Sequence, residues 1–168
     1  AFLRLVGAVG AGLLVWWMLR SGMVTMRHIA IALSLSAVFQ SVVAFLQFVG
    51  QKSVGLWFLG ETVALGPGTV GVGTIAADGV RFLRAYGTLP HANILAGFLV
   101  IGLIALCYLF FQNESMKERA LTLSGIVAVE TGLLLTFSRS GWIVAAFAII
   151  STILFGLLQR EYRKKTYE

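Results

Sequence analysis

The sequence predicts an all-α protein, a polytopic transmembrane bundle of about five membrane helices with one long outer loop. Three observations support this prediction. Of the 168 residues, 58% are hydrophobic and only 12% are charged, whereas a soluble domain carries roughly 25% charged residues. The mean hydropathy is +0.90. The apolar residues lie in long runs without the alternation of a membrane β-strand, so the spans are expected to be helical.

Composition also excludes other classes of protein. The chain is too apolar and too weakly charged to be disordered, and its single cysteine, Cys107, cannot form a disulfide scaffold. There are 13 Lys and Arg residues against seven Asp and Glu residues, which in a soluble protein would suggest nucleic acid as a partner. Because the basic residues fall mostly between apolar runs, we attribute the excess to membrane topology and expect no nucleic-acid partner.

The apolar runs define the expected helices. A helix needs about 20 apolar residues to cross the hydrocarbon core of a bilayer. The runs lie at residues 5–19, 29–49, 94–111, 120–137 and 142–158. We treat residues 1–168 as a single membrane domain. Because the chain begins with Ala1 and has no signal-peptide pattern, we expect it to be a fragment of a longer protein.

The segments between the runs predict the orientation. Residues 20–28 and 112–119 are short and basic, residues 159–168 form a basic tail, and residues 50–91 form the long outer loop. Because Lys and Arg concentrate in cytoplasmic segments, we place the tail and both short connections in the cytoplasm. The basic residues on that side are Arg20, Arg27, Lys117, Arg119, Arg160, Arg163, Lys164 and Lys165. Those on the outer side are Arg4, Lys52, Arg81, Arg84 and Arg139.

Arg139 stands between two apolar runs in the sequence LLLTFSRSGW. One interpretation is a turn arginine that extends to the interface, because burial at a helix centre costs about 2.5–3.5 kcal/mol on insertion scales. The other is an anion contact in an outward-facing cavity. Ser138, Ser140 and Gly141 suit a tight turn with exposed amides, and an arginine beside such amides favours phosphate.

A second polar group lies in the outer loop. Asp78 is expected to cap a short helix, on which Arg81 and Arg84 would share one face at i, i+3. One interpretation is an ordinary amphipathic helix that lies in the interface with snorkelling arginines. The other interpretation is that both arginines contribute to an anion site.

Two polar residues begin the third apolar run. His91 and Asn93 lie at the expected helix N-terminus, where the helix dipole favours anions. The histidine could cap the helix, or it could act as a general base because imidazole titrates near neutral pH. The predicted topology puts both residues on the same side as Arg139. Several cations would then converge on one outward-facing site, which suits a doubly charged diphosphate.

Glu130 lies in the middle of the fourth run. An intramembrane carboxylate is a functional hypothesis by default. It could pair with an arginine of another helix, relay a proton or remain protonated. Arg139 is roughly 13 Å further along a helix, too far for a direct ion pair within one helix. A structural ion pair and a catalytic role both stay open.

No cofactor is expected. The stretch GPGTVGVG at residues 66–73 shares only its glycines with a nucleotide-binding loop, because it lacks the Lys-Ser/Thr pair and the flanking βαβ pattern. We interpret it as a flexible loop. No group of Cys, His and carboxylate residues has the spacing of metal ligands, so we expect no metal.

Two segments resemble the O-antigen ligase and O-antigen polymerase superfamily. They are RAYGTLPHANILAGFL, residues 84–99, and LLLTFSRSGW, residues 133–142. Members carry an Arg-x-x-Gly-x-x-x-(His)-Pro-Asn segment that enters a membrane helix, and a Ser-Arg-Gly/Ser turn two helices later. The matching residues are Arg84, Gly87, His91, Asn93, Ser138, Arg139 and Ser140. Ala92 stands where the family usually has proline, and the resemblance covers about residues 30–158.

The resemblance implies a bacterial inner-membrane glycosyltransferase that works without metal or nucleotide. Such enzymes take a glycan from undecaprenyl diphosphate at the periplasmic face and transfer it to a hydroxyl of lipid A-core, another glycan or a protein. Arg84 and Arg139 inherit the diphosphate-binding role, with His91, Asn93, Ser138 and Ser140 in support. We add Arg81 to the diphosphate-binding residues from its position in the sequence, not from the resemblance. In the family, a histidine of a later outer loop is the proposed base, so the catalytic base is not assigned here.

Two other function classes stay open. Glu130 and the small residues of the helices suit a proton-coupled transporter or a flippase-like module. A non-catalytic membrane subunit is the third possibility.

Overall fold

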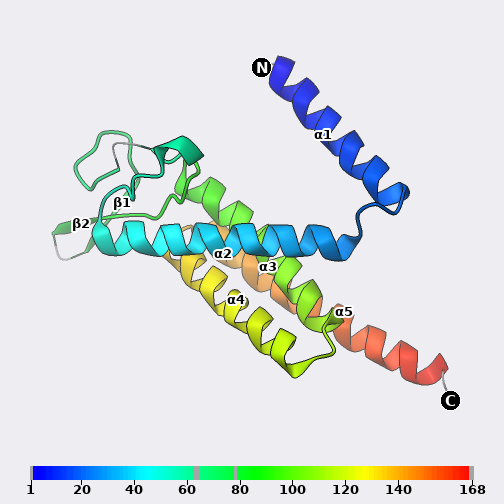
Figure 1. The fold of residues 1–168 in the computed structure, drawn as a ribbon. Coiled ribbons are helices and arrows are strands. Elements are labelled where there is room, and N and C mark those ends of the chain that lie inside the picture. Colours follow the sequence, from blue (N-terminus) through cyan, green and yellow to red (C-terminus); the bar gives the residue numbers. More distant parts are fainter. Residues whose placement is uncertain (1, 63–64, 78, 167–168) are drawn as a thin grey trace.

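The computed structural model describes residues 2–62, 65–77 and 79–166, with side chains over most of residues 6–156. Within these residues the chain forms five α-helices, one short 3-10 helix and one β-hairpin (Figure 1). In chain order they are α1 (Phe2–Arg20), α2 (Met26–Gly50), η1 (Trp57–Leu59), β1 (Thr74–Ala77), β2 (Val80–Leu83), α3 (Ala92–Gln112), α4 (Met116–Leu135) and α5 (Arg139–Thr166).

Each of the five apolar runs is helical, which confirms the mainly helical fold. The helices begin a few residues before their apolar runs, because polar residues such as Thr25 and Ser115 are their N-caps. Helix α5 continues through the basic tail as far as Thr166. By length and composition, α2 and α3 are able to cross a membrane. The side chains of Arg4 and of the four basic tail residues, like the whole of Asp78, lie outside the described residues.

The prediction of an all-α chain is wrong in the outer loop. Here β1 and β2 form an antiparallel hairpin in which Thr74 lies opposite Leu83 and Ala77 lies opposite Val80. The short helix expected over this segment does not form. An Asp-Gly pair between β-branched and aromatic residues favours a two-residue hairpin turn, and Gly79 adopts the positive φ of 78° that such a turn requires.

Helix α3 is the centre of the bundle. It packs against α2, α4 and α5, and its Leu95, Leu99 and Leu103 are fully buried. Their spacing of four residues puts them on one face. Helix α1, in contrast, projects away from the other helices (Figure 1) and leaves large apolar side chains such as Trp16 and Trp17 exposed.

Small residues let the helices approach closely. A Cβ atom at Gly102 of α3 would lie within 2.1 Å of the Cβ atom of Ala37 on α2. A Cβ atom at Gly132 of α4 would lie 2.6 Å from the Oγ atom of Ser41, also on α2. Contacts between small residues are typical of helix packing in membranes, where side-chain packing replaces the hydrophobic effect.

The order of the helices gives the bundle two different ends (Figure 1). The C-termini of α2 and α4 meet the N-termini of α3 and α5 at one end, which we call the loop end because the segment 50–91 covers it. The opposite end holds the N-termini of α2 and α4 and the C-terminus of α3.

Candidate functional site

Gln47 holds the segment that carries Arg84 at the loop end. This glutamine of α2 is fully buried. Its Oε1 accepts the N–H groups of Tyr86 at 3.0 Å and Gly87 at 2.8 Å, and its Nε2 donates to the carbonyl oxygen of Gly87 at 2.8 Å. A side-chain amide thereby satisfies main-chain groups that would otherwise be buried without partners.

Gln40 of α2 and Gln51, the C-cap residue that follows α2, extend this contact. Gln40 accepts the N–H of Thr88 at 2.9 Å and donates to its hydroxyl at 2.6 Å. Gln51 accepts the N–H of Leu83 at 2.7 Å. The segment from Leu83 to Thr88 is therefore fixed to the C-terminal half of α2 at several points, although it contains no helix or sheet of its own after β2.

Glu61 is a buried acid within the segment 50–91, with 4% of its surface exposed. Its carboxylate accepts the Nε2 hydrogen of Gln47 at 2.8 Å and the N–H groups of Val54 at 2.6 Å, Gly55 at 2.8 Å and Leu56. Burial by itself raises the pKa of Glu61. The hydrogen bonds from Gln47 and the three amides outweigh that effect and hold the pKa below its ordinary value.

The guanidinium of Arg84 is fixed in place by two acceptors. Its Nε donates to the main-chain carbonyl of Thr136 at 2.7 Å, and its Nη2 donates to Oδ1 of Asn93 at 2.7 Å. Thr136 is the C-cap of α4 and Asn93 lies in the first turn of α3. A guanidinium has five N–H donors, so donors remain for a ligand after these two bonds.

Only residues 136–138 connect α4 to α5, and the chain turns sharply there. Phe137 has a positive φ of 48°, a conformation that is uncommon for a bulky residue. Its ring centroid lies 5.9 Å from that of Phe48 and 6.2 Å from that of Trp142. These ring contacts stabilise the turn in its strained conformation.

The turn places Arg139 at the first position of α5. Ser138 precedes it and is buried, and its Oγ accepts the N–H of Gly141 at 3.3 Å, which is the bond of a helix N-cap. The hydroxyl of Ser140 lies 3.3 Å from the same Oγ. The serines therefore shape the start of the helix, and the side chain of Arg139 is exposed.

Arg84 and Arg139 line one pocket of about 380 Å³ at the loop end. The other residues of this arginine pocket are Thr74, Ile75, Phe137 and Trp142. Two arginines from distant parts of the chain thus line the same pocket, and none of the six lining residues is acidic. Two guanidiniums in a pocket without an acidic lining residue give a positive charge suited to phosphate or diphosphate.

His91 and Asn93 lie at the start of α3, and neither lines the arginine pocket. His91 is the N-cap of α3, and its Nδ1 accepts the N–H of Asn93 at 3.1 Å. Its ring centroid is 5.8 Å from that of Tyr86. The structure therefore shows His91 as a helix cap, which is one of the two roles considered for it. Asn93 contributes to the site by holding Arg84.

Arg81 does not share a helical face with Arg84, because the segment is a strand. It lies opposite Ala76 in the hairpin and is exposed. It is not among the residues that line the arginine pocket. The expectation that a helix would bring Arg81 and Arg84 together is therefore wrong.

Glu130 lies away from both arginines. It lines a separate, mainly apolar pocket of about 180 Å³, together with Cys107 of α3 and Ile149 of α5. Neither Arg84 nor Arg139 lines this pocket. In the part of the chain that the structure describes, Glu130 forms no ion pair.

The residues that hold the site together were not predicted. Gln40 and Gln47 lie within the apolar run 29–49 and Glu61 lies within the expected outer loop 50–91, and none of them was assigned a role. A signal was present, since Gln40 and Gln47 are seven residues apart and so fall on one face of a largely apolar helix.

The chain matches no known family, no curated protein and no solved structure. Among the described residues, no group of three or more His, Cys, Asp or Glu side chains could hold a metal ion.

Proposed function

We propose that this chain belongs to a multi-pass inner-membrane glycosyltransferase of bacteria, of the O-antigen ligase or polymerase type. Its donor would be a glycan on undecaprenyl diphosphate. Its acceptor would be a hydroxyl of lipid A-core, another glycan or a protein. The observation that carries this proposal is the acid-free pocket that Arg84 and Arg139 line together, on residues whose motifs resemble that superfamily.

Membrane placement is part of the same proposal. Helices α2 and α3 have the length and hydropathy of membrane spans, and we infer that the other three helices cross or enter the bilayer beside them. The loop end, with the arginine pocket, would face the periplasm. The opposite end, with Arg27, Lys117 and Arg119, would face the cytoplasm in accord with the positive-inside rule.

The proposed chemistry uses the arginines as fixed positive charges. In the transfer, the bond from the anomeric carbon to the diphosphate oxygen breaks, and its electron pair moves to the diphosphate. The acceptor oxygen forms the new bond to that carbon and loses its proton to a base that is not assigned. Guanidiniums held in position before the reaction stabilise the developing charge more than they stabilise the bound donor.

The test is transfer activity after substitution in the complete protein. We expect Arg84→Ala and Arg139→Ala each to lower transfer from a lipid-linked donor by about 100- to 1000-fold, the cost of removing a preorganised donor to a developing anion. Arg81→Ala is the matched control, because Arg81 is exposed and outside the pocket. Undiminished transfer by the Arg84 and Arg139 variants would refute their role.

A proton-coupled transporter or flippase-like module is the second candidate, and one observation favours it. Glu130 lines a largely apolar pocket between α3, α4 and α5, the setting in which an intramembrane carboxylate binds and releases a proton. Proton-dependent transport that disappears in Glu130→Gln would support this function. The glycosyltransferase proposal predicts instead that Glu130→Gln retains transfer.

A further inference from the structure

A third pocket, larger than the arginine pocket, lies at the opposite end of the bundle. It is a groove of about 480 Å³ with α3 as its floor and α2 and α4 as its walls. Most of its length is lined by apolar side chains such as Leu35 of α2 and Leu106 and Leu109 of α3. We call it the opposite-end groove.

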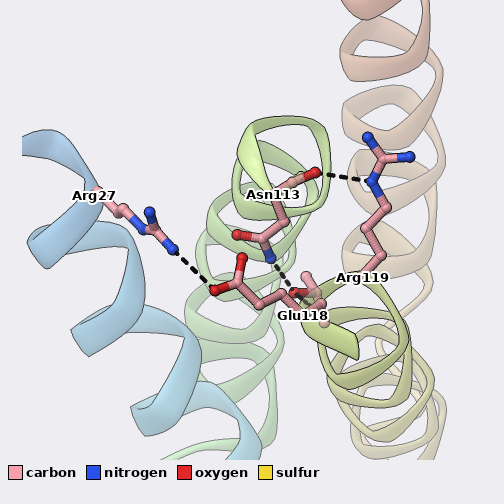
Figure 2. A network of polar contacts seen from close by, with 5 residues as sticks. Arg27, Asn113, Glu118 and Arg119 are labelled. Carbon is pink, nitrogen blue, oxygen red and sulfur yellow. Dashed lines mark hydrogen bonds and ion pairs between the residues drawn. The ribbon is translucent and has the colours of Figure 1, made fainter. Parts of the chain in front are cut away.

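One end of the groove is polar. Arg27 of α2 and Glu118 of α4 face each other there (Figure 2), with 3.6 Å between Nη2 and Oε1 and about half of each side chain exposed. Behind them, Nδ2 of Asn113 donates to the hydroxyl of Thr122 at 2.9 Å. Arg119 is turned away from the groove and donates to the main-chain carbonyl of Asn113 at 2.8 Å. The polar end therefore offers one cation and one anion.

The length of the groove matches one leaflet of a bilayer. Its lining on α2 extends from Arg27 to Val38, about 16 Å at 1.5 Å per residue. The hydrocarbon core of a bilayer is about 30 Å thick. The groove is therefore about half as long as the hydrocarbon core is thick, and it has charged residues at one end. These two properties match a phospholipid of a single leaflet, which has a charged head and apolar chains.

Ser34 is a buried polar residue in the mainly apolar wall that α2 contributes to the groove. It lines the groove, is 5% exposed, and its hydroxyl has no hydrogen-bond partner among the described residues. Buried hydroxyls are normally hydrogen-bonded because leaving them unpaired costs free energy. A ligand with an oxygen acceptor within reach of the groove would remove that cost.

We propose that the opposite-end groove binds one zwitterionic phospholipid of the adjoining leaflet. Its phosphate contacts Arg27, its ammonium contacts Glu118, and one acyl chain lies along the apolar walls. The charges match because the lipid head carries one group of each sign. The bound lipid would replace the ion pair between Arg27 and Glu118 by two charge-assisted contacts. This inference rests on the membrane placement given under the proposed function and goes beyond the proposed transfer reaction.

The experiment is native mass spectrometry of the purified protein in detergent micelles that contain phosphatidylethanolamine or phosphatidylglycerol. We expect a retained phosphatidylethanolamine on the unmodified chain. Ser124→Phe, which fills the groove from the exposed side of α4, should reduce retention at least about tenfold. Val127→Phe is the matched control, because Val127 is exposed on the same helix but is outside the groove. Equal retention by the two variants would overturn the proposal.

Two further variants test the headgroup. Arg27→Ala should weaken retention by about tenfold, the effect of one lost charge-assisted contact. Glu118→Gln should abolish the preference for phosphatidylethanolamine over phosphatidylglycerol, and a preference that persists would refute the ammonium contact. A photoreactive residue at position 35 should give lipid adducts. Adducts between two protein chains would instead assign the groove to a protein partner.

These measurements are independent of catalysis. The substitution Arg84→Ala should lower transfer by about 100- to 1000-fold and leave phospholipid retention unchanged, because Arg84 lies at the other end of the bundle. If the lipid is not retained but the arginine variants lose transfer as expected, only the proposal of lipid binding in the groove is rejected. If the lipid is retained but the arginine variants transfer normally, only the glycosyltransferase proposal is rejected.

Discussion

Gln47 at the loop end and Arg27 at the opposite end are both polar residues of α2, yet their surroundings differ. Gln47 is fully buried and makes hydrogen bonds to Glu61, Tyr86 and Gly87. Arg27 is half exposed and has one ion pair, at 3.6 Å, with Glu118. At the loop end α2 is therefore joined to its neighbours by buried, satisfied polar groups, whereas the ion pair of Arg27 at the opposite end is exposed.

This difference indicates different uses of the two ends. A buried amide with every partner in place fixes the geometry, because each lost bond leaves a main-chain group without a partner. Such rigidity suits a site that must hold guanidiniums in position before a reaction. An exposed ion pair contributes little to stability, so it is free to exchange partners with a ligand.

The largest expected effect comes from removing the buried amide. Gln47→Leu should lower the free energy of unfolding by about 3–5 kcal/mol, because the amides of Tyr86 and Gly87 and the carboxylate of Glu61 each lose a partner. The measurement is chemical unfolding in detergent. Gln112→Leu, at an exposed position of α3, is the control and should change stability by less than about 0.5 kcal/mol. Equal effects would remove the contrast between the two ends.

Glu61 should make the loop end sensitive to acid. Its pKa is lowered in the folded protein, so the unfolded chain binds the proton more readily and stability falls as the pH falls. The contribution of ionised Glu61 to the free energy of unfolding is complete above the ordinary carboxyl pKa of about 4.3. This contribution is lost as the pH drops through the lower pKa of the folded state. Hydrogen exchange at the amides of Val54 and Gly55 between pH 7 and pH 3 measures the loss.

The variant Glu61→Gln is the control for this pH dependence. It keeps the shape of the side chain but has no proton to gain, so acid should then change exchange at Val54 and Gly55 much less. An unchanged pH dependence in the variant would assign the acid sensitivity to another carboxylate.

Asn93 should have a smaller effect, confined to the arginine pocket. Asn93→Leu removes the acceptor that fixes Nη2 of Arg84, and we expect about a tenfold loss of transfer, equivalent to about 1.4 kcal/mol. Asn93→Asp should keep the position of the guanidinium but offset its charge, so donor affinity should fall while the fold is retained. A folded Asn93→Leu variant with full activity would contradict the positioning role.

The smallest effect on stability is expected at the opposite end. Arg27→Ala should change the free energy of unfolding by about 1 kcal/mol or less, because exposed ion pairs contribute little. Thermal unfolding of Arg27→Ala, Glu118→Ala and the double variant together gives the interaction energy of the ion pair directly. A loss comparable to that of Gln47→Leu would show that both ends are equally fixed.

The helices and the meeting of Arg84 with Arg139 could be predicted from the sequence. Long apolar runs indicate helices, and helices that alternate in direction along the chain put both arginines at the same end of the bundle. The hairpin was missed although Asp78–Gly79 is a strong turn signal, because Arg81 and Arg84 at i, i+3 also fit a helix. The role of Gln47 could not be predicted, since its partners Tyr86 and Gly87 lie 39 and 40 residues away in the chain and become neighbours only in the folded bundle.

The C-terminus of α4 also anchors the arginine pocket through its main chain. The carbonyl of Leu135 accepts the N–H of Ala85 at 2.9 Å, and the carbonyl of Thr136 accepts Nε of Arg84. The direction of these carbonyls depends on the number of residues in the helix. Inserting one alanine into α4 would rotate its end by about 100° relative to its beginning. The length of α4 is therefore as much a determinant of the site as any side chain in it.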